Sequence, residues 1–352
     1  AQPQWLANPN LKWETVNASE VGVEFNALNN RLHVEFNYYN KVTNNLMTYV
    51  DRGILGLPNE LINGGSLKNW GEELAATWNQ KINNDWNISI GGNITFMQNQ
   101  VVSLASDLPT GVLIRSFMNN GSAESRTMPG QPIGSFFGYT VAGLYQSYAD
   151  ILASPVASSV GAYRPGDFKF KDVNGDGVIT SSDRSIIGNP SPKFTYGGSI
   201  NITYKKFSIG VDVGGVYGNS IFRTWGSLES PFQRVNYAAF KMNRWHGAGT
   251  SNWEPIISQA DRFNYNGSNY NIEDGSYFRI RNIQLGYTID SKGLARYKIS
   301  SLRLFANVQN LKTWKHNLGY SPEQGGDATA FGYDNAGNAI PVVSTIGLNV
   351  TF

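Results

Sequence analysis

Ser344-Thr-Ile-Gly-Leu-Asn-Val-Thr-Phe352 is the stretch that decides the fold, because apolar and polar side chains alternate along it up to the final phenylalanine. Successive side chains of a β-strand point to opposite faces, so Ile346, Leu348, Val350 and Phe352 share one face. The Thr, Gly and Asn residues between them share the other face. One face suits lipid and the other a water-filled lumen. The pattern predicts the closing strand of an outer-membrane β-barrel, and an amphipathic strand of a soluble β-protein remains the alternative.

The composition fits strands, turns and long polar loops. Among 352 residues, 13% are aromatic and 15% charged, and glycine occurs 38 times. The formal charge of +2, without a run of Lys or Arg, predicts no nucleic-acid partner. The chain has no cysteine, which excludes disulfides and thiolate metal sites, and it has no apolar run of the roughly 18 residues that a transmembrane helix needs. If the chain crosses a membrane, it does so as strands.

Period-two alternation predicts nine strands and several hairpins. Short turns at 27–30, at 83–85 and at Lys205-Lys206 join three strand pairs. A change of phase between Ile280 and Ile283 predicts a β-bulge in this strand, near Arg281 and Asn282. The predicted strands are 21–25, 32–38, 74–82, 86–96, 194–204, 207–217, 278–289, 302–308 and 344–352.

Long stretches rich in Gly, Asn, Ser and Pro separate the hairpins. They lie at about 43–69, 102–192, 218–275 and 311–341. Outer-membrane barrels place short turns on the periplasmic side and long loops outside, whereas loops of this length count against a compact soluble domain. The alternation predicts that residues 1–352 are one stretch of barrel, with the long loops extracellular and the C-terminus periplasmic.

Aromatic residues stand at both ends of the apolar faces, as in the pairs Trp86 and Phe96 or Phe207 and Tyr217. Ten residues at about 3.3 Å each, tilted by about 40°, rise roughly 25 Å, which is the height of the apolar band of a membrane barrel. The inner faces of a soluble sandwich would not place aromatic residues systematically at this spacing. The membrane barrel is therefore the favoured interpretation.

Residues 172–183 have the ligand spacing of an EF-hand calcium loop, with Gly177 at the sixth position. Asp172, Asn174 and Asp176 would supply side-chain oxygens, and Asp183 would supply the closing carboxylate. Val178 would contribute its backbone carbonyl and Thr180 a water-mediated contact. The last position is Asp rather than Glu, and no helix precedes the loop, so we expect weak calcium binding that rigidifies the 102–192 loop. A metal-free turn rich in Asx residues is the alternative.

Several motifs closely resemble those of the SusC/RagA family, the SusC-like TonB-dependent outer-membrane transporters of Bacteroidetes. One motif runs through the predicted metal loop from Asp167 to Thr180, followed by Asp183-Arg184. The others, in the family's order over most of the chain, are Pro132-Ile-Gly-Ser-Phe-Phe-Gly-Tyr139, Gly143-Leu-Tyr-Gln146, Ile187-Gly-Asn-Pro190, Pro192-Lys-Phe-Thr-Tyr-Gly-Gly198, Asp274-Gly-Ser-Tyr-Phe-Arg-Ile-Arg-Asn-Ile283 and Phe305-Ala-Asn-Val-Gln-Asn-Leu311.

The resemblance implies an all-β, antiparallel 22-stranded barrel with an internal plug, energised through TonB and capped by a SusD-like lipoprotein that captures glycans or peptides. It also allows two transporter–lipoprotein pairs to associate as a dimer. This chain would be the C-terminal part, about nine strands, without the plug or the TonB-contacting segment. The end of the chain also resembles the signal read by the barrel-assembly machinery, which implies roles for Thr345, Gly347, Val350 and Phe352.

Three functions remain open: a transporter segment, a calcium-stabilised adhesin or small surface barrel, and an outer-membrane enzyme. Catalysis is disfavoured, because His33, His246 and His316 lie in separate segments without a nucleophile or carboxylate partner in their sequence surroundings. The loop residues Trp225, Trp245, Trp253 and Trp314 could stack on sugar rings, or they could pack the loops or meet the lipoprotein partner. The lumen-facing Arg279, Arg281 and Arg303 could steer an anionic substrate, or they could pair with carboxylates across the wall or from a plug.

Overall fold

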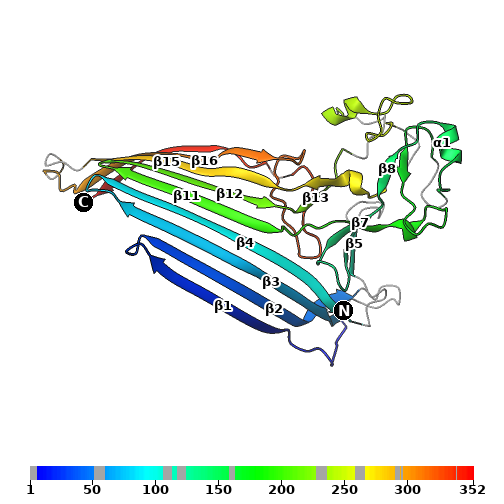
Figure 1. The fold of residues 1–352 in the computed structure, drawn as a ribbon, viewed down its shortest axis with the longest axis horizontal. Coiled ribbons are helices and arrows are strands. Elements are labelled where there is room, and N and C mark those ends of the chain that lie inside the picture. Colours follow the sequence, from blue (N-terminus) through cyan, green and yellow to red (C-terminus); the bar gives the residue numbers. More distant parts are fainter. Residues whose placement is uncertain are drawn as a thin grey trace, which may run out of the picture.

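Nine strands form one antiparallel sheet in the computed structural model, which describes residues 6–50, 60–105, 113–116, 124–157, 163–226, 236–257, 266–289, 294, 296–337 and 339–352 (Figure 1). Sheet neighbours follow chain order, and all nine predicted strands are present. The strands are β1 (Thr15–Ala27), β2 (Leu32–Val50), β3 (Glu60–Lys81), β4 (Trp86–Leu104), β11 (Phe194–Tyr204), β12 (Phe207–Tyr217), β15 (Tyr277–Ile289), β16 (Ser301–Lys315) and β18 (Val343–Thr351).

Tight turns join consecutive strands at one end of the sheet, as predicted. Tyr204 pairs with Phe207, so Lys205 and Lys206 alone form the turn between β11 and β12. Lys205 has a φ of 52°, a left-handed conformation that matches the twist of two-residue hairpins. The predicted bulge is also confirmed, because the register of β15 skips Arg281 against both of its neighbours.

Five strands, β1, β2, β3, β4 and β16, run several residues further than the sequence predicts. The segment 43–69, expected as a loop, is strand through Val50 and again from Glu60. Register shifts near Asn45, which has a φ of 56°, break the period-two pattern, and this is why the extension is hard to see in the sequence. Val50 and Ile62 are buried in a small apolar cluster there, which stabilises the extended hairpin. Likewise β16 continues to Lys315, past the predicted start of a loop at 311.

The other long segments also carry regular structure, which we call the loop unit: the described parts of 113–188, 220–274 and 316–337. It holds three small sheets, β10-β7-β6-β5, β14-β13-β17 and β8-β9. Its strands are β5 (Leu113–Ser116), β6 (Glu124–Thr127), β7 (Ser135–Gly138), β8 (Val141–Leu144), β9 (Phe168–Phe170), β10 (Ser185–Gly188), β13 (Ser220–Arg223), β14 (Ile272–Asp274) and β17 (Tyr333–Asp334). Its helices are α1 (Tyr148–Leu152) and the short 3-10 turns η2 (Ser181–Asp183), η3 (Ala239–Asn243) and η5 (Asn269–Asn271).

The loop unit has an apolar core of its own, with more buried residues than the small cluster at Val50 and Ile62 in the large sheet. Leu144, Tyr145, Phe168, Ile179 and Tyr270 are buried together in that core. Figure 1 shows the small sheets at the end of the large sheet opposite the tight turns and the C-terminus. The described parts of the loops therefore form a folded cap on one end of the wall.

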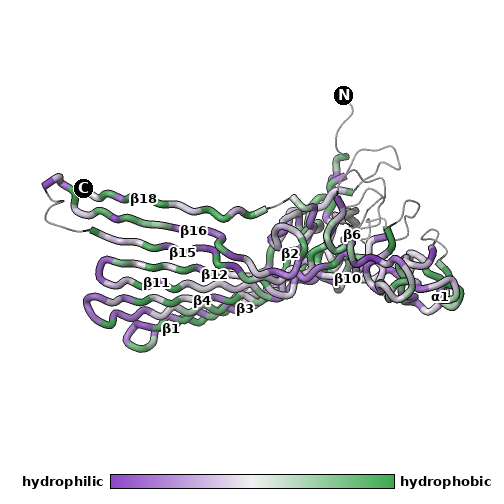
Figure 2. Tube along the Cα trace, turned by 90° about the horizontal axis from the view of Figure 1, so that it is seen from above, coloured by the Kyte–Doolittle hydropathy of each residue, from purple (hydrophilic) through white to green (hydrophobic). Residues whose placement is uncertain are grey.

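The large sheet is a single curved layer. Figure 2 shows its strands in a row from β1 to β18, with hydrophilic and hydrophobic residues alternating along them. In the described part of the chain, no helix has the length and apolar character to cross a membrane.

Candidate functional site

The face of the large sheet that carries the apolar residues is exposed. Val21, Ile200 and Leu285 are 66%, 44% and 52% exposed, although each belongs to the apolar set predicted from the alternation. A soluble sandwich would bury such a face against a second layer, because exposed apolar patches of this extent are rare on soluble monomers. The face is suited to contact with lipid.

Two rows of aromatic side chains bound this apolar face. In the row near the tight turns, the ring centroids of Trp86 and Tyr204 lie 4.3 Å apart and those of Phe207 and Tyr287 lie 4.6 Å apart. In the row near the loop unit, Phe194 lies 5.4 Å from Phe96 and 4.9 Å from Tyr217. The predicted aromatic girdles are thus continuous across neighbouring strands, because the register brings equivalent residues side by side.

Trp314, predicted as a loop residue, belongs to the second row. It lies in β16, where its ring centroid is 5.6 Å from that of Phe278 on β15. The sequence interpretation was wrong because it ended this strand at 308. Just beyond that residue the pairing of β16 with β15 shifts, at Asn310 on β16 and the bulge at Arg281 on β15, and the shift hides the continuation of the strand.

The opposite, lumen-facing side of the sheet is polar and internally hydrogen-bonded. The amide of Asn282 donates to Asp212 at 3.1 Å, and the amide of Asn307 donates to Asn282. Arg303 lies on this side as predicted, with Nη2 3.5 Å from Oγ of Ser208. These groups give this side of the sheet a polar surface that is suited to contact with water.

Arg279 and Arg281 meet a carboxylate from the chain's own loop unit. Arg279 Nη1 lies 2.9 Å from Oε2 of Glu323, and Arg281 Nη2 lies 3.3 Å from its Oε1. Tyr277 also donates to Glu323 at 2.5 Å. Of the two functions considered for these arginines, the structure has them pairing with a carboxylate, which ties the segment after β16 to the wall.

The EF-hand-like loop is held by hydrogen bonds to its own backbone. Asp172 accepts from the N–H of Gly175 at 2.7 Å and of Gly177 at 2.8 Å. Asn174 accepts from the N–H of Asp176 at 3.0 Å, and Asp176 from that of Val178 at 2.8 Å. The loop thus curls around side-chain oxygens at its first, third and fifth positions.

The closing residue of this loop, Asp183, is fully buried. It accepts from the N–H of Val173 at 2.9 Å and of Thr180 at 2.7 Å, and Thr180 caps η2 in return. Burial alone would raise the pKa of Asp183, but these backbone donors hold it below its usual value. Within the loop, Ile179 donates its N–H to the carbonyl of Val156 at 2.7 Å, and its side chain fills the core of the loop unit.

The loop tryptophans mainly pack the loop unit. Trp245 packs against the core and donates from Nε1 to Gln146 at 3.3 Å. Arg223 lies 5.5 Å from the ring centroid of Trp225, and Trp253 lies 5.9 Å from Tyr270. The contacts favour packing over sugar stacking for these three residues.

Buried charges, which the sequence analysis missed, join the parts of the loop unit. Lys241 Nζ lies 2.6 Å from Oε1 of Glu254, and Tyr270 donates to the same carboxylate. Arg223 Nε lies 2.8 Å from Glu273 Oε1. Sequence gives no signal for these contacts, because the partners are 13 to 50 residues apart in irregular segments.

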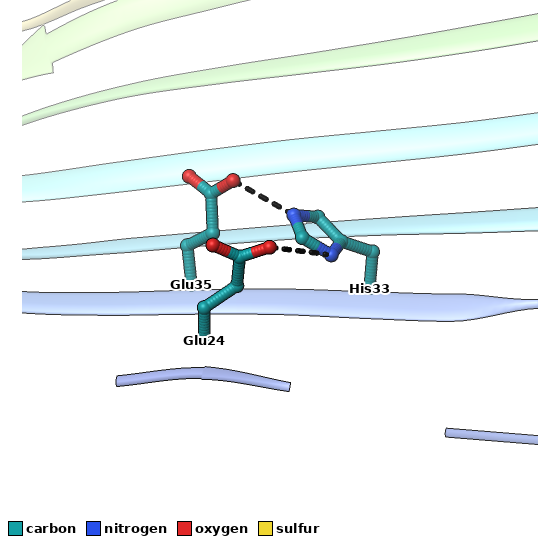
Figure 3. Close-up of side chains that lie close together, drawn as sticks. All are labelled: Glu24, His33 and Glu35. Carbon is teal, nitrogen blue, oxygen red and sulfur yellow. Dashed lines mark hydrogen bonds and ion pairs between the residues drawn. The ribbon is translucent and has the colours of Figure 1, made fainter. Parts of the chain in front are cut away.

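His33 does have carboxylate partners, so the expectation that it lacks them was wrong. His33 Nε2 lies 2.7 Å from Oε1 of Glu35, and Nδ1 lies 3.9 Å from Oε1 of Glu24 (Figure 3). The three residues share one face of the β1–β2 hairpin, and counting alternation across the turn would have found them. His246, in contrast, lies beside the carbonyl of Arg244 in an exposed loop.

In β18, the residues of the predicted assembly signal divide between the two faces of the strand, as the alternation predicts. Gly347 pairs with Phe305, whose ring covers the glycine so closely that a Cβ there would overlap it. Thr345 lies on the same face, while Val350 lies on the apolar face and Phe352 is largely exposed at the end. Their role in assembly stays a prediction.

The two-faced sheet, its aromatic rows and its tight turns define a segment of an outer-membrane β-barrel. Residues 1–311 match the family described as TonB dependent receptor-like, beta-barrel, and the chain belongs to this family. Its strands and family membership confirm the predicted all-β barrel and the resemblance to SusC-like transporters.

Individual relatives agree with this family assignment. The chain is 31% identical over 323 residues to TonB-dependent receptor P3 of Formosa agariphila, covering 90% of this chain and 31% of the relative. It is 25% identical over 324 residues to TonB-dependent receptor SusC of Bacteroides thetaiotaomicron, covering 90% and 30%. The structure of the RagAB peptide transporter superposes with a TM-score of 0.78 at 21% identity, over 99% of this chain and 36% of that chain. The chain thus spans about a third of the length of these relatives.

Proposed function

We propose that the chain forms the C-terminal wall and loops of a TonB-dependent importer of oligosaccharides or peptides. The observation that carries this proposal is the sheet whose outer face is apolar between two aromatic rows and whose inner face is a polar wall. Such a sheet separates lipid from an aqueous passage. Membership of the receptor family supports import over catalysis. The RagAB peptide transporter supports peptides as one substrate class, and oligosaccharides are the other class that the resemblance to the SusC/RagA family implies.

In this proposal the loop unit faces the outside of the cell and the tight turns and C-terminus face the periplasm. A SusD-like lipoprotein docks on the loop unit, and a plug and TonB-contacting segment come from outside the 352 residues. Tight turns at one end of the sheet and long loops at the other support this orientation, because outer-membrane barrels have short periplasmic turns and longer extracellular loops. The folded core of the loop unit gives the partner a preformed surface. Pairs of transporter and lipoprotein could dimerise.

Uptake by cells tests the import proposal. Cells with and without the gene are supplied with labelled oligosaccharides and labelled peptides, before and after inactivation of TonB. Uptake of one class that requires both the gene and TonB is expected. Equal uptake in all strains would overturn the proposal, as would an intact protein with the mass of the 352 residues alone, which would favour the adhesin or small surface barrel.

We further propose that Asp172, Asn174, Asp176, Val178, Thr180 and Asp183 bind calcium and brace the loop unit. The oxygens at the first three positions fit, because they already gather around one loop. Asp183 fits less well, since its two oxygens accept backbone N–H groups, although each carboxylate oxygen keeps a further lone pair. The ion would replace part of this hydrogen bonding.

Calorimetric titration of the intact protein with calcium tests the site. We expect saturable binding that is lost in Asp172→Asn and Asp176→Asn and kept in Asp327→Asn, which removes an exposed carboxylate elsewhere in the loops. If the wild-type protein shows no saturable calcium binding, the loop is a metal-free turn. Uptake and calcium binding are measured separately, so either proposal can fail alone.

A further inference from the structure

Three side chains on the lumen-facing side of β1 and β2 form a compact group close to the turn that joins these strands (Figure 3). Glu24, His33 and Glu35 each offer one ligand atom, and these atoms lie within 4.8 Å of one another. No other group of three His, Cys, Asp or Glu side chains in the described ranges comes as close. The group is partly open to solvent, with the imidazole at its centre.

The strand register holds the group in place. Glu24 lies directly opposite Glu35, and Asn26 lies directly opposite His33. The pairing of β1 with β2 is unbroken from Thr15 to Ala27, without a bulge. The three side chains therefore start from fixed points on paired strands, which position ligands better than loops do.

The two negative charges of Glu24 and Glu35 favour a bound cation. Carboxylates directly opposite each other on paired strands repel and destabilise the pairing. Across the part of the chain that the structure describes, neither Glu24 nor Glu35 pairs with a lysine or an arginine, and His33 is the shared partner of both. A cation bound between the carboxylates would offset the repulsion.

A fourth residue orients the imidazole. Asn26 Oδ1 lies 3.0 Å from Nδ1 of His33 and is an acceptor, so it favours the tautomer whose hydrogen is on Nδ1. Nε2 is then directed at the carboxylate of Glu35, 2.7 Å away. Metal-bound histidines commonly donate from the other ring nitrogen to such a partner, which fixes the ring orientation.

We propose that Glu24, His33 and Glu35 bind a divalent transition-metal ion of the zinc class on the lumen wall, with Asn26 as a positioning residue. One imidazole and two carboxylates suit zinc and its neighbours, whereas calcium and magnesium prefer oxygen ligands alone. Three protein ligands leave a coordination position open to water. Ligand bonds of about 2.0–2.2 Å need only rotation of the side chains, because their atoms already lie within 4.8 Å.

The test is a calorimetric titration of the intact, metal-stripped protein in detergent with zinc chloride, in excess calcium so that oxygen-only sites are filled. We expect one saturable zinc site per protein. Glu24→Gln, His33→Gln and Glu35→Gln should each weaken it at least about tenfold, and Asn26→Ala about 10- to 100-fold. The matched control is His246→Gln, which removes an exposed histidine outside the group and should leave binding unchanged.

Folding of each variant is checked by its heat-modifiable migration in electrophoresis, so that lost binding reports the site. Absence of a saturable zinc site in the wild-type protein would overturn the proposal and leave the group as a histidine–carboxylate ion pair. Equal losses in His33→Gln and His246→Gln would also overturn it. Neither result depends on import activity or on calcium.

Discussion

Arginine substitution at two adjacent residues of β11 tests the assignment of the two faces of the wall. Ile200 lies on the exposed apolar face, opposite Ile90 and Val211, and Asn201 lies on the polar face, opposite Ser89 and Gly210. Only the direction of the side chain differs between the two sites. Ile200→Arg should therefore destabilise the folded barrel strongly, and Asn201→Arg should not.

The depth of Ile200 sets the magnitude. It lies four residues from Tyr204 in one aromatic row and six from Phe194 in the other. At about 3.3 Å per residue and a tilt of about 40°, these separations correspond to heights of roughly 10 Å and 15 Å, which is near the middle of the apolar band. Arginine facing lipid at that depth costs about 2–4 kcal/mol, equivalent to a roughly 30- to 700-fold change in the folding equilibrium.

The assay is urea unfolding of the intact protein in phospholipid vesicles, followed by the heat-modifiable band in electrophoresis. The free energy of unfolding of Ile200→Arg should fall by the amount above, while that of Asn201→Arg should stay close to the wild-type value. Equal losses in the two variants, or a loss confined to Asn201→Arg, would refute the assignment of the apolar face to lipid.

The other predictions concern the closing strand and the metal-like loop. Deleting Phe352 should impair assembly, and a normal amount of heat-modifiable protein in the outer membrane would contradict this. Gly347→Leu should cost about 1–3 kcal/mol in the same urea assay, because the new side chain overlaps the Phe305 ring, and adding Phe305→Ala should recover part of the loss. The pKa of Asp183 is lower in the folded protein than in the unfolded chain, so its contribution is present above the unfolded value of about 3.9 and is lost as the pH falls through the folded value. Hydrogen exchange around η2, corrected for intrinsic rates, should accelerate below about pH 4, and Asp183→Asn should remove most of this acid dependence.

Much of the wall could be predicted because each of its strands has one apolar and one polar face. The alternation in β11 and β12 locates both strands and their turn at Lys205 and Lys206 without any knowledge of their neighbours. The extension of β2 to Val50 could not be found in this way, because the shift near Asn45 moves the side chains to the other face. A register shift between β15 and β16 likewise hid the end of β16, which is why the sequence analysis assigned Trp314 to a loop.

The candidate sites divide similarly. The EF-hand-like loop is contiguous, so its spacing from Asp172 to Asp183 is legible in the sequence, although the capping of η2 by Thr180 is not. The group of Glu24, His33 and Glu35 depends on which residues of two strands stand opposite each other. Register is a property of pairing and not of either strand alone, and it was therefore overlooked.

By itself, the sequence determined the order of strands and turns, the two faces of each strand and the family, because these follow from local alternation and from contiguous motifs. Only the tertiary structure decided that the long loops fold into a unit around Phe168 and Tyr270, that Glu323 closes onto Arg279, and that two carboxylates flank His33. These contacts join residues from separate segments, and their energies depend on distance and burial, which no local pattern encodes.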